Sequence, residues 1–126
     1  MSGFDHLGYS VGDYDKSTAF YNAALGAVGL KRLAEFEAGG SKVAGYGADR
    51  PIFWVNSGKA LRDHVHVAFT ADTRAQVDAF YKGAMAAGGR DNGGPGIREI
   101  YHPNYYAAFV LDPDGHNIEV VCHAPE

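Results

Sequence analysis

The sequence predicts an α+β fold in which two repeated βαβββ modules form a cupped mixed sheet. Two observations favour this fold. A shift of the chain by 60 residues places His6 on His66 and aligns segments 19–21 and 79–81, which both read Ala-Phe-Tyr. Each half also contains one stretch with helical periodicity among several with the alternation of strands. A repeat of this kind is typical of one structural unit used twice.

The length sets the domain organisation. A chain of 126 residues suits one compact domain, and we expect it to consist of modules over about 1–61 and 62–126. In each module the helix covers one face of the sheet and leaves the other face uncovered. We expect these uncovered faces to carry the functional residues.

The first module begins with a strand over 6–11, where Leu7, Tyr9 and Val11 alternate with polar or small residues. A helix follows, with Asp13 or Asp15 as its N-cap. Gly29 is expected to end it. Three further strands are predicted around 31–37, 42–46 and 51–56.

The second module repeats this order. A strand over 64–70 precedes a helix that starts at Asp72 or Thr73 and stops at Gly88 or Gly89. The glycine-rich segment 88–96 is predicted to be a flexible connection. Three strands are predicted around 98–101, 106–111 and 117–123, and the Asp-Pro-Asp-Gly turn at 112–115 makes the last two a hairpin.

A metal site is predicted on the uncovered faces. Glu119 stands on the opposite side of its strand from Ile118 and Val120, among hydrophobic neighbours. A carboxylate buried there needs a bonding partner or a metal ion. Two imidazoles, His6 and His66, and this carboxylate form a donor set suited to a divalent first-row metal. His64 points to the same side as His66 and is its rival, but the repeat favours His66.

The bulk composition narrows the class of partner. The formal net charge of −4, with scattered basic residues, argues against nucleic acid as the main partner. The chain contains no apolar run long enough to span a bilayer, and its first residues lack an export signal. The single cysteine, Cys122, forms no intrachain disulfide and fits a cytoplasmic protein.

Three pairs of motifs resemble the vicinal oxygen chelate superfamily, which groups glyoxalase I, fosfomycin-resistance proteins, extradiol dioxygenases and bleomycin-resistance proteins. The motifs are DHLGYSV with STAFYNAALG, HVAF with DAFYKGAMAAGG, and the ending FVLDPDGHNIEV. The resemblance implies paired modules with metal ligands from the first, fifth and eighth strands, here His6, His66 and Glu119. It also implies one divalent ion (Zn, Mn, Fe, Ni or Co), a small substrate that chelates it through oxygen atoms, and a homodimer.

Two positions of the sequence narrow the choice among the subgroups of this superfamily. Glyoxalase I enzymes carry a fourth ligand, a glutamate, where this sequence has Trp54, and extradiol dioxygenases carry a tyrosine where it has Phe109. Fosfomycin-resistance proteins share the His, His, Glu pattern. We therefore expect a glyoxalase-like metal-dependent enzyme of isomerase, lyase or transferase type. The alternative is a metal-free protein that binds or sequesters a small molecule, as bleomycin-resistance proteins do.

Further candidate residues lie near the end of the chain. The predicted catalytic groups are Glu119, Tyr101 and His102. The tyrosine and the histidine are included because phenol and imidazole serve as acid or base when their pKa is suitably shifted. The predicted substrate-binding residues are Trp54, Arg98, Tyr105 and Tyr106. The alternative for the tyrosines is strand packing, and for Arg98 it is a solvent-exposed side chain.

Overall fold

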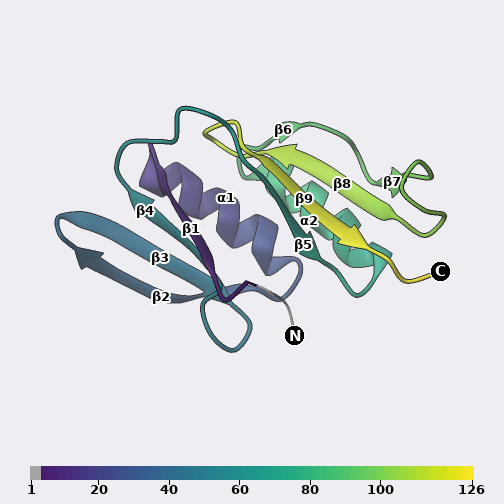
Figure 1. Ribbon diagram of the computed structural model, residues 1–126, viewed down its shortest axis with the longest axis horizontal. Coiled ribbons are helices and arrows are strands. Elements are labelled where there is room, and N and C mark those ends of the chain that lie inside the picture. The colour runs from purple at the N-terminus through teal and green to yellow at the C-terminus, as the bar shows by residue number, and fades with distance from the viewer. Residues whose placement is uncertain (1–3) are drawn as a thin grey trace.

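The computed structural model describes residues 4–126 and contains two mixed sheets, each covered on one face by a helix (Figure 1). The strand order is β1-β4-β3-β2 in the first sheet and β5-β9-β8-β6 in the second, with β7 paired to β8. This arrangement confirms the predicted fold class. The elements are β1 (Leu7–Val11), α1 (Tyr14–Gly26), β2 (Lys31–Ala38), β3 (Ser41–Gly47), β4 (Phe53–Ser57), β5 (His66–Thr70), α2 (Arg74–Ala86), β6 (Arg90–Asp91), β7 (Gly96–Ile97), β8 (Tyr106–Leu111) and β9 (Asn117–Cys122).

The two helices show the repeat most clearly. The bounds of α1 and α2 differ by 60 residues at both ends, the same shift that relates the histidines. Asp13 caps α1 by accepting a hydrogen bond from the Lys16 backbone N–H, and Thr73 caps α2 in a capping box with Gln76. In both modules the first strand is parallel to the last one and the other neighbouring strands are antiparallel.

The prediction of a strand over 98–101 is wrong. The structure has two strands of two residues each, β6 and β7, and the chain turns over 99–101. The segment before this turn contains Gly93, with a φ of 140°, and Pro95, and neither residue suits the interior of a regular strand. A short strand, β6, also forms inside the segment predicted to be a flexible connection.

The core lies between the helices and the sheets. It is built from buried aromatic and aliphatic side chains such as Phe20, Phe53 and Phe80. The buried Tyr21 hydroxyl on α1 donates to Asp112 in the turn between β8 and β9, which joins the two modules. Both helices lie on the same side of the sheets, so the uncovered faces of both sheets are turned to the other side (Figure 1).

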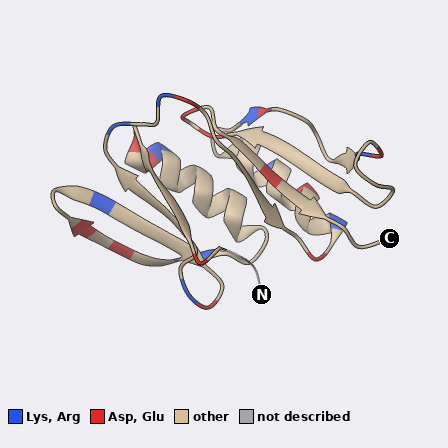
Figure 2. Ribbon diagram, viewed as in Figure 1, with Lys and Arg blue, Asp and Glu red and all other residues tan. Residues whose placement is uncertain are grey.

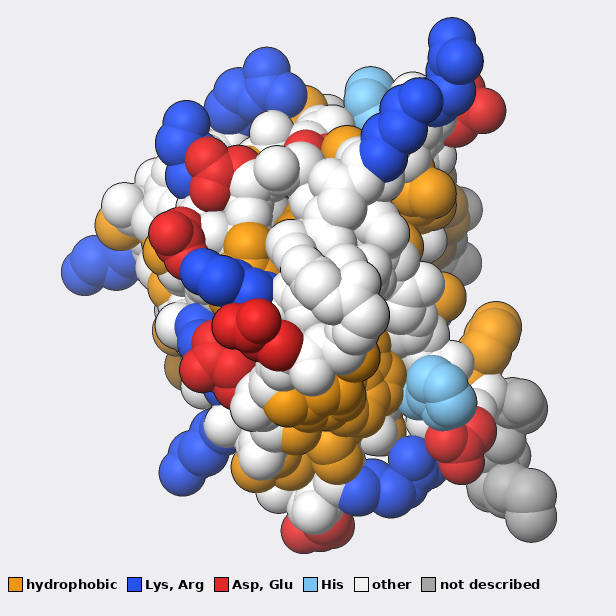
Figure 3. Space-filling model, turned by 90° about the vertical axis from the view of Figure 1, so that its left-hand side faces the viewer, with side chains coloured by type: hydrophobic (Ala, Val, Ile, Leu, Met, Phe, Trp, Pro, Cys, Tyr) orange, Lys and Arg blue, Asp and Glu red, His pale blue; other side chains and the backbone are white. Residues whose placement is uncertain are grey.

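The charged side chains are distributed without a continuous basic surface on the views shown. Lysine, arginine and acidic residues are scattered along the ribbon (Figure 2), and both signs are interspersed at the end of the molecule that carries the β2–β3 hairpin (Figure 3). Among residues 4–126, no helix is long and apolar enough to cross a membrane.

Candidate metal and ligand site

Glu119 is a buried carboxylate on the uncovered face of the second sheet. Its side chain is 1% exposed, and both of its carboxylate oxygens have partners. His66 Nε2 lies 2.8 Å from Oε1, and the Tyr105 hydroxyl donates to Oε2. These two contacts explain how a carboxylate can be buried among the apolar residues of β9.

The proton positions follow from the chemistry of the carboxylate. An ionised carboxylate only accepts hydrogen bonds, so His66 donates from Nε2. A divalent ion in place of that proton has one nitrogen and one oxygen donor already side by side, so the His66–Glu119 pair fits a metal. Burial, followed by the bond to Glu119, raises the pKa of Tyr105 to about 12. Tyr105 therefore remains a phenol that donates to the carboxylate.

Arg98 brings a positive charge to the ring of Phe109, which neighbours both residues of this pair. The Arg98 guanidinium lies 5.3 Å from the centre of the Phe109 ring, and its Nη2 donates to the Gly94 carbonyl oxygen at 2.7 Å. The Phe109 ring centre is 6.3 Å from that of His66. Arg98 is thus held beside the His66 side of the uncovered face, where it can attract an anionic ligand.

His6 lies on the first module and has its own carboxylate partner. Its Nδ1 donates to Asp5 Oδ1 at 2.7 Å, and Arg50 approaches the same oxygen at 3.3 Å. The bond from His6 and the charge of Arg50 hold the pKa of Asp5 below its ordinary value. Because Nδ1 carries the proton, Nε2 is the nitrogen with a free lone pair, which is the usual arrangement of a metal-ligating histidine.

The single chain does not bring the three predicted ligands together. Within residues 4–126, no group of three or more His, Cys, Asp or Glu side chains is arranged to hold a metal ion. The reason lies in the fold: His6 directly precedes β1 of the first sheet, the His66–Glu119 pair belongs to the second sheet, and the two uncovered faces point the same way (Figure 1).

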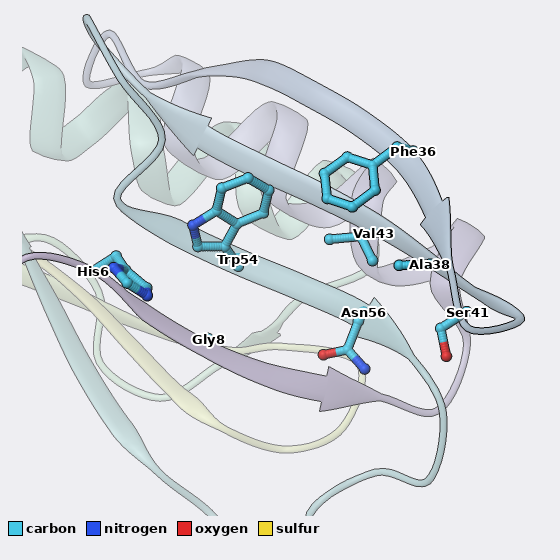
Figure 4. Close-up of a pocket in the computed structure, with 8 residues that line it drawn as sticks. All are labelled: His6, Gly8, Phe36, Ala38, Ser41, Val43, Trp54 and Asn56. Carbon is cyan, nitrogen blue, oxygen red and sulfur yellow. The ribbon is translucent and has the colours of Figure 1, made fainter.

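His6 instead shares a groove with Trp54 on the first sheet (Figure 4). The groove has a volume of about 550 Å³, within the range of small-molecule sites. Trp54 is half-buried there, between two glycine-containing strands. The lining residues are His6, Gly8, Phe36, Ala38, Ser41, Val43, Trp54 and Asn56.

The two predicted proton-transfer residues lie at the rim of the second sheet. Tyr101 is 60% exposed, and its ring centre is 4.7 Å from that of Tyr105. His102 Nδ1 accepts from the Asn104 backbone N–H, so its Nε2 donates to His123 Nδ1 at 2.8 Å. Both rings lie against that of Tyr105, the residue that donates to Glu119, and neither side chain is hydrogen-bonded to Glu119 itself.

Tyr106 lies on the opposite, helix-covered side of β8. Its hydroxyl donates to Asp78 on α2 at 2.6 Å, and the Arg74 guanidinium lies 5.1 Å from its ring centre. The alternation of side chains explains this separation, because neighbouring residues at the start of a strand point to opposite faces. Of the two adjacent tyrosines, Tyr105 reaches the candidate site and Tyr106 supports the helix.

The family follows from a comparison of the whole sequence with family models. Residues 3–120 match the model of the "Glyoxalase/Bleomycin resistance protein/Dioxygenase superfamily". The chain belongs to this superfamily. That match spans both modules and includes His6, His66 and Glu119.

Individual relatives agree with this assignment. The chain is 27% identical over 124 residues to a metallothiol transferase FosB from Shouchella clausii, covering 95% of this chain and 80% of the relative. A glyoxalase/bleomycin resistance protein from Albidiferax ferrireducens matches with a TM-score of 0.74 and 26% identity, over 96% of this chain and 99% of that one. The fosfomycin resistance protein FosX from Mesorhizobium loti has the same fold, with a TM-score of 0.68 and 19% identity over 98% and 94% of the two chains.

Several contacts of the predicted site residues were not expected from the sequence. Asp5 orients His6, His123 bonds to His102, and Gly45 accommodates the Trp54 ring. Only Gly45 left a signal, because a glycine inside a strand often marks a close approach by another group. Asp5 and His123 are polar residues at strand ends, and such residues commonly face solvent.

Proposed function

We propose that this protein is a divalent-metal-dependent enzyme that acts on a small organic substrate with chelating oxygen atoms. The observation that carries the proposal is the buried Glu119 carboxylate with His66 Nε2 at 2.8 Å, a donor pair that fits a first-row metal. Kinship to a metallothiol transferase favours transferase chemistry over isomerase or lyase chemistry.

The chain's own residues have separate roles in this proposal. His6, His66 and Glu119 would hold the ion, which would polarise substrate oxygens and stabilise negative charge that develops on them. Asp5 fixes the ring of His6, and Tyr105 fixes one oxygen of Glu119. Arg98 would attract an anionic substrate to the same face.

We infer that two copies of the chain complete each site. In one chain the donors lie on two sheets whose uncovered faces point the same way, so they do not converge. A second copy that places its first sheet over the second sheet of its partner would bring His6 to the other two ligands. A two-fold dimer of this kind contains two equivalent sites.

Metal content tests the proposal directly. Protein without an affinity tag, dialysed and then offered Zn, Mn, Fe, Ni or Co, should bind close to one equivalent of one of these ions. His66→Ala should lose it, because it removes a nitrogen donor. His64→Ala is the matched control, since His64 is an exposed histidine two residues away. A wild-type protein that takes up none of these metals contradicts the proposal.

Mixing two inactive variants tests the shared site. His6→Ala and His66→Ala chains should each lose the metal alone. After unfolding and refolding together in equal amounts, they should regain about one quarter of the wild-type capacity, because half of the dimers are mixed and each has one intact site. A site formed within one chain would regain nothing.

A second candidate function is metal-free binding of a small molecule. It is favoured by the same contacts, because His66 and Tyr105 satisfy both oxygens of Glu119 without any ion. In that case neither His66→Ala nor added chelator changes the affinity for the bound compound. A loss of affinity after either treatment rejects this candidate.

A further inference from the structure

Three residues form a row across the first sheet. Trp54 on β4 is paired with Gly8 on β1 and with Gly45 on β3. A Cβ atom at Gly45 would lie 2.6, 2.7 and 2.8 Å from three consecutive carbons of the indole. Such nearly equal distances place that atom over the face of the ring and not beside its edge. The absence of a side chain at Gly45 therefore lets the indole lie flat on the sheet.

The opposite face of the indole is turned to the groove. Phe36, which is 49% exposed, stands at one side with its ring centre 6.0 Å from that of Trp54 and an angle of 68° between the planes. Figure 4 shows the two rings on the same side of the first sheet. The groove thus has an aromatic floor and an aromatic side wall.

Polar groups stand at the two ends of this groove. His6 lies at one end, with Asp5 bonded to its Nδ1, and Asn56 and Ser41 lie at the other (Figure 4). The residues between them are apolar, and none of the eight lining residues is acidic. The chemistry that matches the groove itself is a flat apolar body, and oxygen atoms of that body would lie at the His6 end through the ion that His6 is proposed to hold.

We propose that Trp54 is a stacking surface for a planar aromatic ligand whose oxygen atoms lie toward His6. This inference rests on the proposed function for the oxygen end and names the class of substrate. A planar ring can contact the whole exposed indole face at van der Waals distance, whereas a puckered saturated ring contacts only part of it. Aromatic stacking corresponds to roughly a 3- to 10-fold gain in affinity beyond burial alone.

Two test ligands, both of them carboxylates, distinguish the effect of a flat ring on affinity from the effects of charge and size. Naphthalene-2-carboxylate is flat, and decahydronaphthalene-2-carboxylate has the same carbon skeleton and charge but is puckered. Trp54 is the only tryptophan, so an ¹H–¹⁵N spectrum contains one indole N–H signal. With metal-free protein, the flat compound should shift this signal saturably and bind at least about 3-fold more tightly than the puckered one.

Variants of the protein test whether Trp54 causes the preference for the flat compound. Trp54→Leu should abolish the difference between the two compounds, and Trp54→Phe should keep most of it, as measured by ligand-observed NMR. His64→Ala should leave it unchanged, because His64 is exposed and is not among the lining residues. Equal binding of the two compounds overturns the proposal.

The two proposals can fail independently. Aromatic preference in a protein that takes up no metal would contradict the metal site and support the stacking surface. Metal uptake without aromatic preference would do the reverse.

Discussion

Trp54 and Glu119 occupy equivalent positions in the two modules but have opposite chemistry. Trp54 pairs with Gly8 on β1, and Glu119 pairs with Ala68 on β5, and Gly8 and Ala68 are related by the 60-residue repeat. One position carries the largest apolar side chain of the protein. The other carries a carboxylate that is 1% exposed.

The neighbours decide which chemistry each position can support. On the antiparallel side, Trp54 pairs with Gly45 and Glu119 pairs with Phe109. Gly45 makes room for a ring that lies on the sheet, whereas the bulk around Glu119 excludes water and two donors neutralise the cost of burial. The repeat thus fixes the backbone position of the two residues, and the side chains beside them determine which chemistry each position supports.

The largest expected effect comes from removing the buried carboxylate. Glu119→Ala should abolish metal binding and lower the free energy of unfolding by about 2–4 kcal/mol, because it leaves the His66 and Tyr105 donors without their partner. His6→Ala should also abolish metal binding but change stability within about 0.5 kcal/mol, since the side chain is 58% exposed. Urea unfolding and metal analysis measure the two quantities. Equal stability losses in both variants would contradict the difference between the modules.

A methyl group at Gly45 tests the first module. Gly45→Ala should lower the free energy of unfolding by about 1–3 kcal/mol, because the new Cβ would overlap the Trp54 ring. The near-ultraviolet circular dichroism of the single tryptophan should change as the ring is displaced. Gly26→Ala is the matched control, because its Cβ would meet nothing within 4 Å, and it should be neutral or slightly stabilising. An unchanged Trp54 signal in Gly45→Ala would show that the ring does not rest there.

The hydroxyl of Tyr105 should matter less than the carboxylate that it contacts. Tyr105→Phe leaves one oxygen of Glu119 buried without its donor and should cost about 1–2 kcal/mol of stability. It should also weaken metal binding by about 10-fold, because that oxygen is no longer held in place. Tyr101→Phe is the control, since Tyr101 is exposed and its ring is tilted at 51° against that of Tyr105. A Tyr105→Phe variant with wild-type metal affinity would show that the hydroxyl does not orient Glu119.

The repeat made most of the fold predictable from the sequence. The shift that aligned His6 with His66 also gave both helices, and alternation gave the strands that have a continuous apolar face. The segment around Arg98 escaped prediction because its short strands are held by contacts with β8 and Phe109, not by their own pattern. Local alternation carries no information on such pairing.

The candidate site was predictable only in part. Alternation placed Glu119 on the uncovered face, where the structure has it beside His66. The same rule could not show that His6 faces a different groove, because the relative placement of two sheets depends on how their helices pack. It also could not separate Tyr105 from Tyr106 before the start of β8 was known.

The smallest expected effect is a change in the stability of the two modules at alkaline pH. Each has a tyrosine bonded to a glutamate, Tyr14 to Glu35 and Tyr105 to Glu119, and burial with that bond raises both pKa values to about 12. In the unfolded chain a tyrosine pKa is about 10, so this stabilisation is complete below about pH 10 and is lost as the pH rises toward 12.

The stability gap between the wild type and each Tyr→Phe variant should therefore narrow above about pH 10, because only the wild type loses the protonated phenol advantage. Urea unfolding at pH 8, 10 and 11 measures the gap for Tyr14→Phe and Tyr105→Phe, with Tyr101→Phe as the control. A gap that stays constant with pH for Tyr105→Phe would mean that ionisation of the Tyr105 hydroxyl does not change the free energy of unfolding. In that case Glu119 is held by His66 alone, and the second module would have one fixed contact instead of two.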